Sequence, residues 1–178
     1  MIIVPTIRNT GSHFVLKMLG AVEPWRHNGV LSWRTPGRTK DSIIFDHVFP
    51  HQKGLYLPLI ADPENITIVP LRHPYLTEKS WIDRGFETGD LIDMWSVMVE
   101  WIAPLKPNFL PLDVPSRESW LSALNSRTGL SLRTDWRPEG SKSGNSALTH
   151  KDVQPSKEFI ALAEVYRDFL GQFYEETS

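Results

Sequence analysis

Four short apolar runs recur along the chain, separated by polar or proline-bearing segments. They occupy residues 2–5, 42–47, 66–71 and 108–114. Nearly continuous apolar runs of this length are typical of strands covered on both faces, as in a parallel sheet flanked by helices. The four runs therefore predict the strands of a central sheet.

Apolar residues at helical spacing predict three helices. The first has an apolar face made of Leu91, Met94, Trp95, Met98, Val99 and Ile102. The second covers residues 116–129, where Gly129 is placed as its C-terminal stop. The third carries its apolar residues between Phe159 and Phe173, near the end of the chain.

The alternation of strands and helices predicts the fold class. We expect a three-layer α/β fold with a central, mainly parallel sheet of about four to five strands flanked by helices. Ligands of such folds bind at the carboxyl ends of the strands. Two stretches, 21–41 and 131–157, lack a clear period. Loops this long in a compact domain are usually lids, binding loops or mobile segments.

Composition narrows the function classes. With 178 residues, 40% of them hydrophobic, the chain is expected to form a single domain over residues 1–178. A net charge of −2 disfavours nucleic-acid binding driven by overall charge. The absence of cysteine excludes disulfides and thiolate metal sites. No signal-peptide core or membrane-spanning run is evident, so we expect a soluble cytoplasmic protein of bacterial or viral origin, without a membrane partner.

The first candidate site is the turn that follows the first run, in the sequence "TIRNTGSH". A strand that turns at once into a helix points unpaired N–H groups at one spot, which favours an anion. Gly11 allows close approach of the backbone, Thr10 and Ser12 offer hydroxyls, and Arg8 offers a charged fork. The alternative is an ordinary turn in which Ser12 caps the helix. The nucleotide-triphosphatase pattern is not met, because Thr6 and Ser12 replace its first glycine and its lysine.

The second candidate site follows the run at 66–71. Arg72 leaves this strand at its carboxyl end, and Pro74 is placed to begin a helix. Ser80 lies two helical turns further on, and Gly85 ends the pattern. The two polar side chains are candidates to bind one oxyanion, whereas the alternative for Arg72 is a surface ion pair.

The third candidate site is the pair Asp46 and His47, at the end of the run at 42–47. The unperturbed pKa of histidine lies close to neutral pH, so a histidine at this position can act as a general base. The alternative is a structural histidine bonded to a carbonyl group. His51 lies four residues after His47, but Pro50 argues against a helical metal pair, so no metal site is predicted.

Together these elements resemble the sulfotransferases that use 3′-phosphoadenosine 5′-phosphosulfate (PAPS). The family's first turn, K-[SGA]-G-[TS]-[TS], is matched by Asn9, Thr10, Gly11, Ser12 and His13. Its R-x-P signature, with a serine eight residues after the arginine, is matched by Arg72, Pro74 and Ser80. Many members carry K-T-H-x-P at a strand end, where "FDHVFP" offers His47. The match runs over about residues 2–175 and implies a P-loop-like sulfotransferase fold.

The sequence departs from the family at two lysines. Asn9 replaces the lysine of the turn, and Phe45 replaces the lysine of K-T-H. The positive charge that stabilises the leaving oxygen then has to come from Arg8, Lys17 or a basic loop. Losing one preorganised donor typically costs about 10²–10³-fold in rate, so the departure bears directly on activity.

The resemblance implies an enzyme that moves a sulfuryl group from PAPS to a hydroxyl or amine, releasing PAP without a metal. The acceptor is expected to be a small molecule or a glycan. The implied catalytic residues are His47 and Arg8. The implied donor-binding residues are Asn9, Thr10, Gly11, Ser12, His13, Phe14, Arg72, Ser80 and, in the second long stretch, Lys142. Phe14 and Trp81 are the candidates to stack on adenine.

Two alternatives remain open at this stage. The strand ending in Asp46 also suits a Mg²⁺-dependent nucleoside or nucleotide kinase, although the missing loop lysine counts against that reaction. A non-catalytic module that binds PAP or another nucleotide is the other alternative. Oligomeric state is not indicated by any pattern.

Overall fold

The computed structural model describes residues 1–8, 10–20, 23–27, 30–34, 42–132 and 148–174. Its strands are β1 (Ile2–Thr6), β2 (Glu23–His27), β3 (Val30–Arg34), β4 (Ser42–His47), β5 (Ile66–Leu71) and β6 (Asn108–Pro111). Its α-helices are α1 (Ser12–Met18), α2 (Lys53–Ala61), α3 (Pro74–Ile82), α4 (Gly89–Val97), α5 (Arg117–Thr128), α6 (Lys157–Val165) and α7 (Arg167–Leu170). Shorter helical segments are η1 (Pro50–Gln52), η2 (Met98–Ile102), η3 (Ala103–Leu105) and η4 (His150–Asp152).

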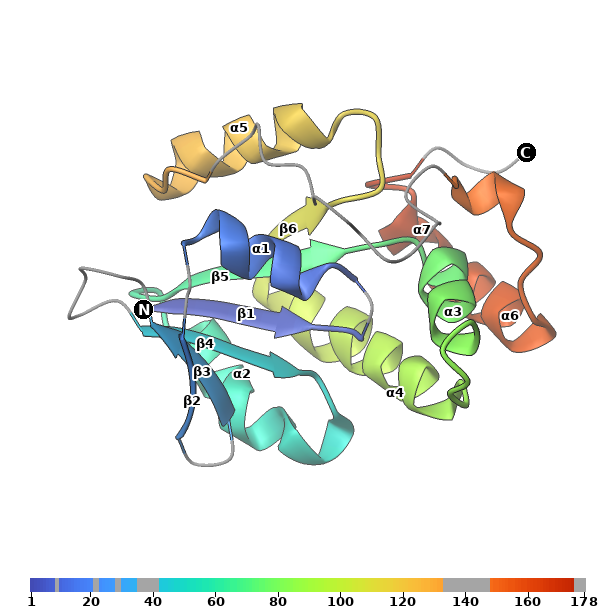
Figure 1. The fold of residues 1–178 in the computed structure, drawn as a ribbon, viewed down its shortest axis with the longest axis horizontal. Coiled ribbons are helices and arrows are strands. Elements are labelled where there is room, and N and C mark those ends of the chain that lie inside the picture. Colours follow the sequence, from blue (N-terminus) through green and yellow to red (C-terminus); the bar gives the residue numbers. More distant parts are fainter. Residues whose placement is uncertain (9, 21–22, 28–29, 35–41, 133–147, 175–178) are drawn as a thin grey trace.

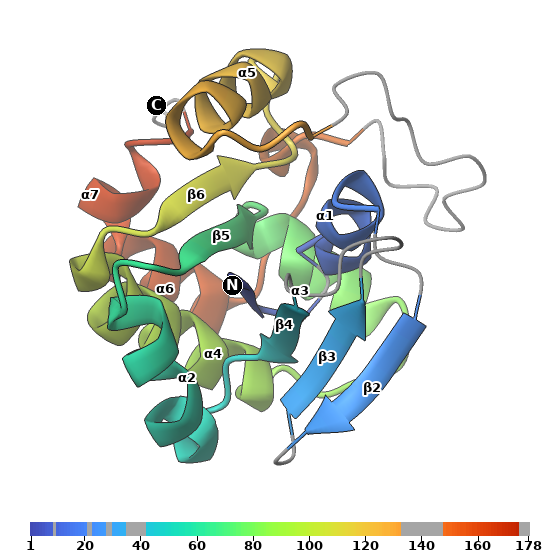
Figure 2. The ribbon, with the colours of Figure 1, turned by 90° about the vertical axis from the view of Figure 1, so that its left-hand side faces the viewer.

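The strands form one sheet in the order β2-β3-β4-β1-β5-β6 (Figure 1). Strands β4, β1, β5 and β6 are mutually parallel, as the continuous apolar runs predict. Helices cover both faces of this parallel part, so the expected three-layer α/β fold is confirmed (Figures 1 and 2). Among the described residues, no helix is both long enough and apolar enough to cross a membrane.

The segment 21–41 was expected to be an irregular loop, and this prediction is wrong for ten of its residues. Strands β2 and β3 pair there as an antiparallel hairpin, and β3 pairs with β4. The sequence between the two strands is Asn28-Gly29, the dipeptide that most favours a two-residue hairpin turn. The other long stretch, 131–157, contains η4, but residues 133–147 lie outside the described part of the chain.

Side chains of β1 alternate between two hydrophobic cores. Ile3, and Ile7 just after the strand, belong to the larger core, whereas Ile2 and Val4 belong to the smaller one. The alternation follows from the two-residue period of a strand. Because both faces of the central strand need apolar partners, its sequence reads as one continuous apolar run.

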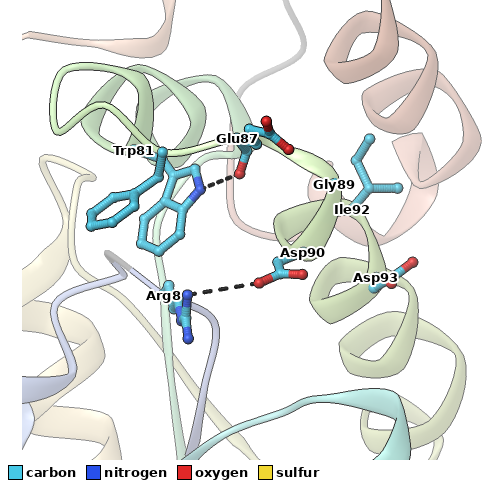
Figure 3. Close-up of a pocket in the computed structure, with 8 residues that line it drawn as sticks. Arg8, Trp81, Glu87, Gly89, Asp90, Ile92 and Asp93 are labelled. Atoms are coloured by element: carbon cyan, nitrogen blue, oxygen red, sulfur yellow. Dashed lines mark hydrogen bonds and ion pairs between the residues drawn. The ribbon is translucent and has the colours of Figure 1, made fainter.

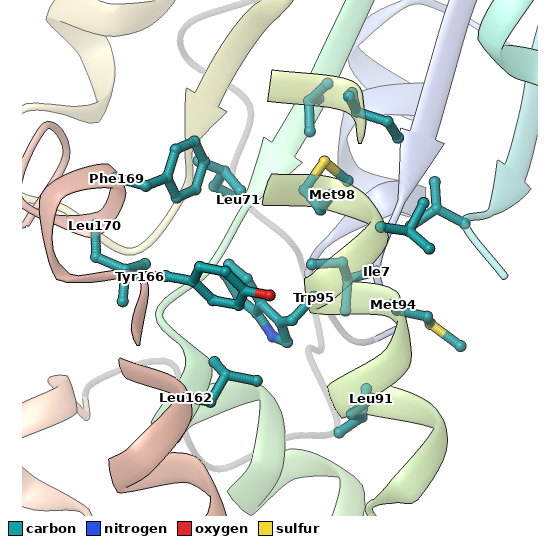
Figure 4. Close-up of a cluster of buried hydrophobic side chains, with 14 of the residues drawn as sticks. Ile7, Leu71, Leu91, Met94, Trp95, Met98, Leu162, Tyr166, Phe169 and Leu170 are labelled. Carbon is teal, nitrogen blue, oxygen red and sulfur yellow. The ribbon is translucent and has the colours of Figure 1, made fainter. Parts of the chain in front are cut away.

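The larger core lies between the sheet and helices α4, α6 and α7 (Figure 4). Trp95 is its largest fully buried side chain, with Met94 and Met98 on the same helical segment. The predicted helix at 91–102 is confirmed, although it changes from α-helix to π-helix at Met98. The predicted helix at the end of the chain is divided into α6 and α7 at Tyr166, whose backbone is not helical.

The smaller core lies on the other face, beneath α1 and α5 (Figure 2). Leu121 and Leu124 of α5 pack into it, together with Val15 and Leu16 of α1. Helix α5 ends as predicted, because Gly129 adopts the left-handed conformation that stops a helix (φ 70°).

Candidate functional site

The carboxyl ends of the four parallel strands lie along one edge of the sheet (Figure 1). Thr6 of β1 is paired with His47 of β4, and Leu71 of β5 is paired with Pro111 of β6. After β1 the chain passes to the hairpin β2–β3 and then to β4, which all lie on one side of β1 in the sheet. After β5 the chain passes to β6, which lies on the other side. Neighbouring strands with opposite exits form the crevice in which open α/β sheets bind ligands.

The turn between β1 and α1, which we call the opening turn, lies at this crevice. A hydrogen bond from the side chain of Thr10 closes it. Thr10 is fully buried, and its hydroxyl donates to the Ile7 carbonyl over 2.7 Å. Gly11 takes the left-handed conformation (φ 87°) and is the N-cap of α1. A Cβ at this position would lie 2.7 Å from Cδ1 of Leu112, so the turn packs directly against the exit of β6. Both observations explain why glycine is required there.

Arg8 is held by aromatic rings and a carboxylate. Its guanidinium carbon lies 4.9 Å from the ring centre of Phe49 and 5.0 Å from that of Trp81. Nη1 lies 3.8 Å from Oδ2 of Asp90 in α4 (Figure 3). With 31% of the side chain exposed, the guanidinium remains in contact with solvent. The sequence indicated this arginine but not its aromatic supports, which come from segments distant in the chain.

Arg8 also lines a pocket of about 570 Å³. The lining residues are Arg8, Trp81, Phe86, Glu87, Gly89, Asp90, Ile92 and Asp93. Most of them belong to the end of α3, the start of α4 and the link between these helices (Figure 3). A volume of this size is typical of small-molecule sites.

His47 is oriented by Thr6, the residue beside it on β1. Thr6 Oγ1 donates to the Asp46 carbonyl over 3.3 Å and lies 3.0 Å from Nδ1 of His47. A hydroxyl has one hydrogen, so with that hydrogen on the carbonyl the Thr6 oxygen accepts from Nδ1–H. In the tautomer that carries its hydrogen on Nδ1, the lone pair available to accept a proton is on Nε2. Asp46 itself accepts the backbone N–H of His47 through Oδ1, over 2.8 Å.

We call Arg8, His47, Phe49, Trp81 and Asp90 the open cluster. The ring of Phe49 connects His47 to Arg8 in this cluster. Its centre lies 6.4 Å from that of the His47 ring, and the guanidinium of Arg8 lies over its face. The cluster therefore combines a histidine, a cation and an adjoining pocket at the ends of β1 and β4.

Arg72 and Ser80 belong to the neighbouring strand end. Arg72 follows β5 directly and is partly buried. Burial lowers the pKa of its guanidinium, whereas the nearby charges of Asp113 and Tyr174 raise it. Pro74 begins α3 as predicted, and Ser80 lies inside this helix with only 4% of its surface exposed. A shared oxyanion for the two side chains stays a prediction.

A second polar cluster lies beside Arg72 and was not predicted from the sequence. The closed cluster consists of His73, Asp113, His150 and Tyr174. Asp113 accepts the His73 backbone N–H at Oδ2 (2.8 Å) and the Tyr174 hydroxyl at Oδ1 (2.9 Å). The rings of His73 and His150 stack with centres 4.2 Å apart. The expected strand at 108–114 ends earlier, at Pro111, which places Asp113 after β6. No sequence pattern indicated Asp113, His150 or Tyr174.

Burial dominates the electrostatics of the closed cluster. It lowers the pKa of His73 to about 3, with a further lowering from His150. It also raises the pKa of Asp113, against the lowering effect of the two hydrogen bonds from His73 and Tyr174. The pKa of the Tyr174 hydroxyl is raised by burial and by Asp113. The imidazole of His73 is thus neutral at physiological pH, and its Nδ1 accepts the N–H of Tyr75.

The remaining predicted residues are distributed more widely. Phe14 faces α5, where the guanidinium carbon of Arg117 lies 5.5 Å from its ring centre. Phe45, in place of the family's lysine, is buried in the smaller core. Asn9 and Lys142 lie outside the described residues, and so do the side chains of Ser12 and His13 in α1. Their predicted contacts with the donor stay predictions.

Comparisons with protein-family models, with curated proteins and with solved structures found no match to this chain. The α/β fold therefore rests on the structure, and the resemblance to sulfotransferases rests on the motifs alone. Within the described part of the chain, no group of three or more His, Asp or Glu residues is arranged to hold a metal ion.

Proposed function

We propose that the protein is a PAPS-dependent sulfotransferase acting on a hydroxyl or amine acceptor. The observation that carries the proposal is the common edge of the sheet, where Arg8 and Arg72 follow β1 and β5 and His47 ends β4, three adjacent parallel strands. These are the positions at which the family resemblance expects the leaving-group cation, the base and the 3′-phosphate ligand. Adjacent strand ends also form the usual ligand crevice of an α/β sheet.

The charges at this edge suit a donor with two anionic ends. Arg8 follows β1 and Arg72 follows the neighbouring β5. We assign the 5′-phosphosulfate end to Arg8 and the opening turn, and the 3′-phosphate to Arg72 with Ser80. Arg8 takes the role of the lysine that Asn9 replaces. A guanidinium already positioned over two rings stabilises developing negative charge without reorganising during the reaction.

In the proposed reaction, His47 takes the proton of the acceptor hydroxyl or amine. The acceptor oxygen or nitrogen forms a bond to sulfur while the bond between sulfur and the phosphate oxygen of the donor breaks. Arg8 balances the negative charge that gathers on the departing PAP. Thr6 holds the Nδ1 side of the ring, so that the lone pair of Nε2 receives the proton.

Calorimetry with PAP tests the donor site. The wild type should bind PAP at sub-millimolar concentration, and Arg72→Ala should lower the affinity about 10–100-fold, as expected for a charged hydrogen bond. Arg127→Ala is the matched control, because Arg127 is exposed in the last turn of α5. No binding of PAP to the wild type, or equal affinities of the two variants, would reject the donor assignment.

Thermal shift separates the proposal from the kinase alternative. Stabilisation by PAP in EDTA supports the sulfotransferase, whereas stabilisation by ATP only with Mg²⁺ supports the kinase. Detection of a sulfated product from PAPS then separates a working enzyme from a module that only binds PAP.

A further inference from the structure

We propose that the pocket beside Arg8 binds the acceptor, and that this acceptor carries a protonated amine next to a flat apolar group. The role as acceptor rests on the proposed function, but the preference for an amine rests on the pocket alone. Arg8 connects the two, because it lies both at the end of β1 and in the pocket wall. A molecule bound here lies next to the opening turn.

The charge of the pocket selects the amine. The lining includes three acidic residues, Glu87, Asp90 and Asp93, and Arg8 is the only cation among its described residues. Asp90 already faces that arginine at 3.8 Å. The two remaining acidic residues have no counter-charge within the lining, so the side of the pocket away from Arg8 attracts a cation.

Helix geometry alone does not explain these acidic residues. Asp90 lies in the first turn of α4, where a carboxylate stabilises the helix dipole. Asp93 lies beyond that turn and on the same face, three residues further on, and it also lines the pocket. Asp93 is exposed at the surface of the helix. It is therefore the residue that best reports on a ligand, because its replacement leaves the capping of α4 intact.

The apolar part of the ligand is matched by an aromatic wall. Phe86 stacks on Trp81 with ring centres 4.4 Å apart, and 51% of Phe86 remains exposed. The indole N–H of Trp81 donates to the Glu87 carbonyl, which holds the ring in place (Figure 3). An exposed ring on a fixed support offers a face for a planar group and supports cation–π contact.

Three fragments of matched size test the charge preference without PAP. They are 2-phenylethylamine, 2-phenylethanol and phenylacetate, which are cationic, neutral and anionic at neutral pH. Ligand-detected NMR titrations at low salt should show the amine binding at least about 5-fold more tightly than the alcohol, with phenylacetate weakest. The preference should shrink as salt is added, because exposed charges are screened.

Asp93→Asn should lower the affinity for 2-phenylethylamine about 2–5-fold and leave that for 2-phenylethanol unchanged. Asp168→Asn is the matched control, because Asp168 is exposed on α7, away from the pocket lining. Phe86→Leu should weaken both fragments, which tests the aromatic wall independently. Melting temperatures verify that each variant is folded.

The outcomes separate this inference from the proposed function. Binding of the amine by a protein that does not bind PAP supports the pocket and rejects the sulfotransferase. Binding of PAP without any preference for the amine supports the donor site and overturns the acceptor class. An unchanged affinity in Asp93→Asn overturns it as well.

Discussion

The open and closed clusters lie at neighbouring strand ends and use similar residue types, but their surroundings differ. In the open cluster, Arg8 is about one-third exposed and adjoins a pocket. In the closed cluster, His73 is 6% exposed, and Asp113 accepts two hydrogen bonds from the protein itself. The first cluster leaves its cation partly exposed to solvent, whereas the second uses its polar groups to join β5, β6 and the end of the chain.

This difference shows why strongly shifted pKa values do not by themselves identify a reaction site. The lowered pKa of His73, about 3, and the raised pKa of Asp113 both belong to the closed cluster, and burial is the main cause of both shifts. Such shifts accompany structural networks as well as catalytic ones. The pocket and the exposed arginine are what separate the two regions, so variants in each should affect different properties.

Of these variants, the one that removes the proposed base should show the largest change, a loss of turnover. We expect His47→Ala to lower turnover about 10²–10⁴-fold with PAP affinity nearly unchanged, because a general base acts in the transition state. Steady-state kinetics with PAPS and a sulfated product as readout measure this. His51→Ala is the control, since His51 is an exposed histidine stacked on the same Phe49. Equal activity of the His47 variant and the wild type would remove His47 from the mechanism.

Acid should lower the free energy of unfolding of the protein by a few kcal/mol, through protonation in the closed cluster. The folded-state pKa of His73 is about 3, below its usual 6.5, so the unfolded chain binds the proton first. Stability should therefore fall as pH drops from about 6.5 towards about 3, with Asp113, whose pKa is raised, acting in the opposite direction. Urea unfolding at several pH values measures the slope. A slope that is the same in His73→Gln would contradict this origin.

Deleting one hydroxyl of the closed cluster should cost about 1–3 kcal/mol, because Tyr174→Phe leaves a buried carboxylate oxygen without its donor. Tyr166→Phe is the comparison, since its hydroxyl bonds to Ser96 and to the exposed Glu100. We expect the Tyr166 variant to lose less, as measured by urea unfolding at neutral pH. A greater loss in the Tyr166 variant would mean that the closed cluster does not anchor the C-terminal segment.

Replacing the arginine of the open cluster should have the smallest effect on stability. We expect Arg8→Met to change the free energy of unfolding by about 1 kcal/mol or less, because partly exposed ion pairs and cation–π contacts are weak. The same variant should lose PAP affinity, as measured by calorimetry. A loss of stability as large as that of Tyr174→Phe would show that Arg8 serves the fold rather than a ligand.

The sequence predicts the parallel part of the fold well because each buried strand carries its own signal. The bounds of β4 and β5 match the expected 42–47 and 66–71, where apolar side chains face both cores. The hairpin was missed because β2 and β3, "EPWRH" and "VLSWR", interleave charged and aromatic residues without the alternation of a half-buried strand. Only Asn28-Gly29 between them carried a usable signal.

The candidate site is predictable to the extent that it follows the strands. Arg8, His47 and Arg72 were found because each comes directly after an apolar run or ends one. The pocket walls and the closed cluster depend on how distant segments pack, so no local pattern indicates them. The hydrogen bond between Tyr174 and Asp113, for example, joins residues that are 61 positions apart.

The contact between Gly11 and Leu112 joins the opening turn, which contains Arg8, to the segment that carries Asp113. Leu112 directly precedes Asp113 of the closed cluster, and its side chain fills the space that a Cβ on residue 11 would need. Any side chain on residue 11 would require this leucine to move. If the donor binds at the opening turn as we propose, a shift of Leu112 would change the shape of that turn, and substitutions in the closed cluster would then alter PAP affinity without touching the donor.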